Sequence, residues 1–74
     1  MDKNYDELFG QNIRRMRRAV GMTQEQLAVK LQLAGCDITR SALAKIEVGQ
    51  RHIYPDEIKL LKTVMKLDYD DFFI

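Results

Sequence analysis

The chain has few of the residues that mark secreted, membrane and metal-binding proteins. Its 74 residues include one cysteine, one histidine, one proline and no tryptophan. A single cysteine cannot form an internal disulfide, and without a Cys/His cluster there is no ligand set for zinc. The apolar runs are too short to span a bilayer, and the acidic start of the chain is unlike a secretory signal. We therefore expect a cytoplasmic protein without metal, cofactor or membrane partner.

An excess of charge of either sign is also missing, because the net charge is only +1. The charges are unevenly distributed, however. Residues 10–52 carry eight Lys and Arg against three Asp and Glu, a net charge of +5, and the two flanking segments carry −2 each. Salt screens exposed charges beyond about 8–10 Å, so the basic middle segment can still act on phosphates. No nucleophile–base pair, carboxylate pair or phosphate loop is evident, which argues against an enzyme.

What the sequence does contain is typical of one small helical domain spanning residues 1–74. The composition, 46% hydrophobic and 31% charged, is that of an ordered protein, and nothing resembles a strand or a repeat. A stripe at spacings of four, three and four predicts the first helix: Phe9, Ile13, Met16 and Val20. Gly21 follows at once and suits the end of that helix.

Two helix start signals come next. Thr23 is a good N-cap, and Gln26 completes a capping box, which predicts a second helix to about residue 33 or 34. Residues 35–37 break that helix, and Thr39 then caps a third one that ends at residues 48–50. The two helices are short and close together, and each has its own cap.

The remainder of the chain completes the predicted fold. Within the third helix, Leu43 and Ile46 are expected to face the core. Pro55 suits the first position of a fourth helix with a wide apolar face. Asp68 is expected to cap a last short turn that packs Phe72 and Phe73. The fold class is therefore all-α, a compact five-helix bundle.

This arrangement resembles the helix-turn-helix family of phage repressors and Cro proteins, the XRE family, from about Gly10 to Phe73. The matching positions are Ile13, Arg14, Arg17, Gly21, Met22, Thr23, Gln24, Leu27, Ala28, Ile38, Thr39, Leu43, Ile46, Glu47 and Gly49. The resemblance implies a lambda-repressor-like fold whose second and third helices form the helix-turn-helix, with double-stranded DNA as partner. One departure is that residues 32–36 make the second helix or the turn about five residues longer than the family norm.

The resemblance also implies base contacts from the outward face of the third helix. They are expected from Arg40, Ser41, Ala44 and Lys45, and an arginine can donate two hydrogen bonds to guanine. The alternative is a solvated helix face. We favour DNA contact, because the capping and core pattern already determines which face is outward.

Contacts to phosphate are expected from Gln24, Arg14, Gln50, Arg51 and His52. Gln24 begins the second helix, where free N–H groups and the helix dipole favour an anion, although ordinary capping is the alternative. For the other four the alternative is plain solvation.

Two further roles are structural. The resemblance implies a partly buried salt bridge between Arg17 and Glu47, which holds the third helix in place. Cys36 is expected to be a turn residue rather than a redox switch, because no cation lies next to it in the sequence.

The predicted function is a sequence-specific, repressor-type transcriptional regulator with no small-molecule ligand. A module of this size buries little surface on DNA, so a homodimer on a palindromic operator is expected. Apolar residues near the end of the chain are expected to contribute to self-association: Tyr69, Phe72, Phe73 and Ile74. The alternative, left open by the low net charge, is a protein-interaction module or antitoxin component with weak or no DNA reading.

Overall fold

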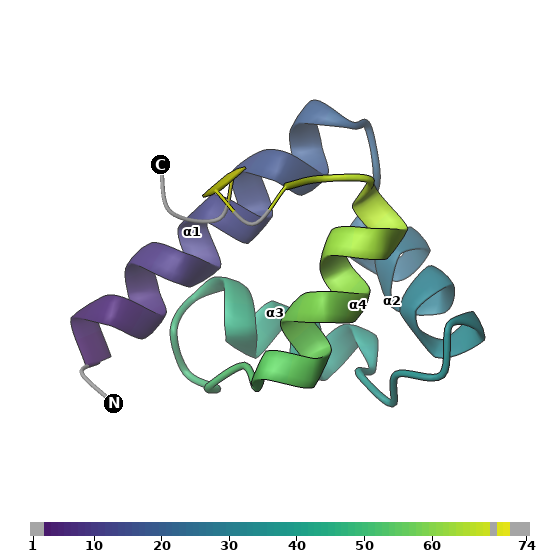
Figure 1. Ribbon diagram of the computed structural model, residues 1–74. Coiled ribbons are helices and arrows are strands. Elements are labelled where there is room, and N and C mark those ends of the chain that lie inside the picture. Colours follow the sequence, from purple (N-terminus) through teal and green to yellow (C-terminus); the bar gives the residue numbers. More distant parts are fainter. Residues whose placement is uncertain (1–2, 69, 72–74) are drawn as a thin grey trace.

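The computed structural model describes residues 3–68 and 70–71, which form four α-helices. The helices are α1 (Lys3–Ala19), α2 (Gln24–Leu33), α3 (Arg40–Glu47) and α4 (Pro55–Met65). Figure 1 shows them around a common centre, with α1 on one side of the bundle and α2 on the other. The predicted all-α fold is confirmed.

The count of five helices needs correction. After α4, the described residues contain only a 3-10 turn at residues 70–71, closed by a 3.1 Å hydrogen bond from the Asp71 N–H to the Asp68 carbonyl. The Asp68 N–H also donates a 2.9 Å hydrogen bond to Asp71 Oδ2, so local hydrogen bonds close this short turn. Phe72 and Phe73, which were expected to pack in this turn, lie outside the described residues.

Local capping explains where the central helices begin. The Thr23 hydroxyl accepts a 3.1 Å hydrogen bond from the Gln26 N–H, and the Gln26 side chain accepts one of 2.9 Å from the Thr23 N–H. Thr39 caps α3 in the same way, accepting a 3.1 Å bond from the Ala42 N–H. Each cap satisfies N–H groups that the helix itself leaves unpaired. Both predicted helix starts are therefore confirmed.

The core forms where the inner faces of the four helices meet. Its fully buried side chains are Ile13, Leu27, Leu31, Ile38, Leu43, Ile46 and Leu61. Val20, predicted to join this stripe, is 45% exposed. The reason is that α1 ends at Ala19 and the backbone turns away at Gly21, which has a φ of +77°.

A close backbone approach joins α1 to α3. Gly10 lies in the middle of α1, and a Cβ there would overlap the carbonyl oxygen of Ile46 and lie 2.9 Å from the carbonyl carbon of Glu47. Only glycine leaves room for this contact. The end of α3 is thereby held directly against α1.

The long connection between α2 and α3 is an ordered turn over residues 34–39. Gly35 adopts a φ of +94°, and the Cys36 N–H donates a 2.9 Å hydrogen bond to the Leu31 carbonyl. Cys36 is 5% exposed, so this turn residue also packs into the core. The Gln32 side chain donates a 3.3 Å hydrogen bond to the Ile38 carbonyl, which ties the far end of the turn to α2.

Candidate nucleic-acid interface

The end of α3 is held by an ion pair with α1. Arg17 Nε lies 2.8 Å from Glu47 Oε2, and Arg17 Nη2 lies 3.0 Å from Glu47 Oε1. The residues are 7% and 2% exposed. The hydrogen bonds from Arg17 to Glu47 raise the pKa of the arginine above its ordinary value. The pair is therefore a buried, doubly bonded link between the two helices.

The same pair reaches the start of α2. Arg17 Nη1 donates a 2.8 Å hydrogen bond to the carbonyl of Met22, and Gln24 Nε2 donates one of 3.2 Å to Glu47 Oε1. Gln24 is half-buried and keeps its second amide N–H. The first residue of α2 and the last of α3 are thus fixed relative to each other.

The outward face of α3 is polar and open. Arg40, Ser41 and Lys45 are exposed and Ala44 is half-buried, while Leu43 points into the core. Among the described residues, no ion pair engages Arg40 or Lys45. The four residues expected to contact bases therefore share one face, and its two cations are available to a partner.

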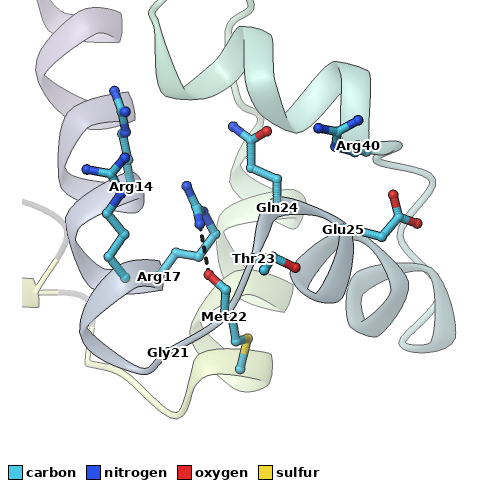
Figure 2. Close-up of a pocket in the computed structure, with 9 residues that line it drawn as sticks. Arg14, Arg17, Gly21, Met22, Thr23, Gln24, Glu25 and Arg40 are labelled. Carbon is cyan, nitrogen blue, oxygen red and sulfur yellow. Dashed lines mark hydrogen bonds between the residues drawn. The ribbon is translucent and has the colours of Figure 1, made fainter.

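A basic groove of about 780 Å³ lies beside this face, between α1 and the N-termini of α2 and α3. Figure 2 shows Arg14, Gln24 and Arg40 around it, each from a different helix. The lining also includes Arg18, Thr23 and Glu25. Arg18 and Glu25 were not singled out from the sequence, although Arg18 follows Arg14 by four residues and so shares its helix face.

The three residues expected to contact phosphate from the loop after α3 differ in their surroundings. Gln50 is exposed. Arg51 donates hydrogen bonds of 3.1 and 2.9 Å to the two carboxylate oxygens of Glu57, which raises the arginine pKa and lowers the pKa of Glu57 below 4.5. His52 Nδ1 lies 3.2 Å from Asp6 Oδ1. Arg51 and His52 thus anchor the loop to α4 and α1.

The described part of the chain lacks two other kinds of site. No group of three or more His, Cys, Asp and Glu residues is placed to hold a metal ion. No helix there has the length and apolarity needed to cross a membrane.

The helix α3 is short and has a polar outward face. It is fixed against a preceding helix and flanked by a basic groove, and these features define a helix-turn-helix DNA-binding domain. The helix-turn-helix family HTH_3 matches residues 13–72, and the chain belongs to this family. It is a DNA-binding transcription regulator and not an enzyme.

The structure is similar to the crystal structure of the restriction-modification controller protein C.AhdI from Aeromonas hydrophila. The two share 31% sequence identity over 96% of each chain, with a TM-score of 0.84. None of the curated proteins matches the sequence. The longer turn before α3 is therefore compatible with the family fold over nearly the whole chain.

Proposed function

We propose that this chain is a sequence-specific, repressor-type regulator that places α3 in the major groove of a palindromic operator. The observation that carries this proposal is the outward face of α3. No carboxylate of the described residues pairs with Arg40 or Lys45 there, while the Arg17–Glu47 pair fixes the helix from behind. Arg40, Ser41, Ala44 and Lys45 contact the base edges, and the arginine suits guanine.

Phosphate contacts flank this face in the proposal. Gln24 uses its remaining amide N–H at the start of α2, and Arg14 reaches the backbone from α1. Gln50 is the phosphate contact of the following loop. We expect Arg51 and His52 to contribute less to phosphate binding than the sequence suggested, because Glu57 and Asp6 already bind them.

The functional unit in this proposal is a homodimer that acts in the cytoplasm. A single α3 presents too little surface for a tight specific complex, whereas two copies on adjacent half-sites double the contacts. Control of restriction-modification genes is the narrower form of the proposal, because the similarity to C.AhdI extends over 96% of both chains.

Selection of bound sequences from a random DNA pool tests the proposal, with sedimentation of the free protein and of the complex. We expect inverted half-sites about 10 base pairs apart, centre to centre, and a dimer on the selected DNA. Similarity of the recovered site to DNA beside restriction-modification genes would support the narrower form. A pool without an enriched sequence would favour the protein-interaction module instead, and a monomer on DNA would exclude the homodimer.

A further inference from the structure

The basic groove beside α2 is also lined by an acidic residue, Glu25. Arg14, Arg18 and Arg40 line the groove and are exposed, and Arg17 also lines it but is offset by buried Glu47. Glu25, at the second position of α2, is the acidic residue of the described lining. A carboxylate at this place weakens the attraction that the three exposed arginines exert on DNA.

Glu25 has no partner of its own within the described residues. Its side chain is exposed, and neither an ion pair nor a side-chain hydrogen bond engages the carboxylate. Figure 2 shows Glu25 on the side of the groove where Arg40 lies. An acid in the first turn stabilises a helix through its dipole, but that effect does not depend on which group lies opposite.

A carboxylate that lines the same groove as Arg40 acts differently on the two contacts that this arginine can make with DNA. When the guanidinium binds a phosphate, a second negative charge comes close to Glu25, and the two anions repel each other. When the guanidinium binds the edge of a base, the group in front of it is neutral, and Glu25 repels only the phosphates that Gln24 and Arg14 contact. Non-specific binding depends almost entirely on phosphate contacts, so it carries the larger penalty.

We propose that Glu25 is a specificity determinant that disfavours phosphate in front of Arg40 and so directs this arginine to base edges. The inference rests on the proposed role of Arg40 in base contact. Glu25 acts through Arg40 and is a positioning residue. It lowers binding to unrelated DNA more than binding to the operator.

The test compares Glu25→Gln with Asp56→Asn. Each change removes one negative charge from the first turn of a helix, but Asp56 lies in α4 and does not line the groove. Affinities for the selected operator and for a scrambled duplex of equal length are measured by fluorescence anisotropy at several salt concentrations. We expect Glu25→Gln to raise affinity for the scrambled duplex by about threefold, and for the operator by less. Asp56→Asn changes both affinities by the same factor.

A second pair of variants, which both carry Arg40→Ala, separates this role of Glu25 from a general change in charge or stability. With Arg40→Ala present, Glu25→Gln should no longer affect the two duplexes differently, because the arginine through which it acts is gone. Melting curves of each variant report any change in helix stability. Equal effects of Glu25→Gln on both duplexes, or a selective effect that persists without Arg40, would overturn this proposal and leave the regulatory function standing. An unmodified protein that shows no preference for any DNA would overturn both.

Discussion

Arg17 and Glu47, 30 residues apart in the sequence, are joined by two hydrogen bonds of 2.8 and 3.0 Å between α1 and the end of α3. The glutamate also accepts a 3.2 Å bond from Gln24 at the start of α2. Three of the four helices therefore meet at one buried carboxylate. The orientation of the outward face of α3 depends on this junction.

Loss of Arg17 should be strongly destabilising. Arg17→Met leaves the carboxylate of Glu47 buried without its charged partner, and we expect a loss of about 3–5 kcal/mol in the free energy of unfolding. Urea denaturation measures this change. The double change Arg17→Met/Glu47→Leu removes both charges and should recover most of the loss. A double variant as unstable as the single one would show that packing, and not a stranded charge, determines the effect.

The contact between α1 and α3 makes Gly10 hard to replace. Alanine favours a helix by about 1 kcal/mol over glycine, yet the added Cβ would overlap the carbonyl oxygen of Ile46. We expect Gly10→Ala to lower stability by about 1–3 kcal/mol, because backbone cannot move aside as a flexible side chain does. Gln11→Ala, at an exposed position of the same helix, is the control and should be neutral or slightly stabilising in thermal melts. A stabilising Gly10→Ala would contradict the close approach.

The start of α3 depends on a single hydroxyl. Thr39→Ala removes the acceptor of the 3.1 Å bond from Ala42 and should cost about 1 kcal/mol. Operator affinity should fall with it, since Arg40 is the first residue of the helix and its backbone would fray. Thr39→Ser keeps the acceptor and should behave like the unmodified protein in both the melt and the binding assay. Equal behaviour of the alanine and serine variants would show that the Thr39 hydroxyl does not stabilise the start of α3.

The Arg51–Glu57 pair should give an acid-sensitive part of the stability. Hydrogen bonds from Arg51 lower the pKa of Glu57 in the folded protein below its ordinary value of 4.5. The contribution of the Arg51–Glu57 pair to the free energy of unfolding is therefore present above about pH 4.5. It is lost as the pH falls through the lowered pKa of Glu57. We expect Glu57→Gln to be less stable than the unmodified protein at pH 7, with the difference shrinking in more acidic solution. Urea denaturation as a function of pH measures it, and a difference independent of pH would contradict the role of the ion pair.

Local signals in the sequence predicted the helix-turn-helix because each helix start is encoded within a few residues. Thr23 with Gln26, and Thr39 alone, cap their helices in the structure as the sequence indicated. The prediction failed at the end of α1, where the apolar spacing continues although the backbone has already changed direction. Val20 continues the apolar spacing of α1 but follows its last turn, so it faces solvent.

The contacts of the loop after α3 required the tertiary structure. His52 and its partner Asp6 are 46 residues apart, and no periodicity links them. Arg51 lies six residues from Glu57, but the pairing depends on how the loop enters α4. For the same reason Glu25 was not singled out from the sequence, because its place in the arginine groove depends on α1 and α3.

The most direct test of the regulatory proposal is a titration of the selected operator with the Arg40→Ala/Lys45→Ala variant. The control is Lys30→Ala/Lys59→Ala, which removes the same charge from exposed positions on other helices. We expect the α3 variant to bind the operator no better than a scrambled duplex, with an unchanged melting temperature. The control should keep its preference for the operator. Operator binding retained by Arg40→Ala/Lys45→Ala would contradict the proposal that α3 reads the DNA.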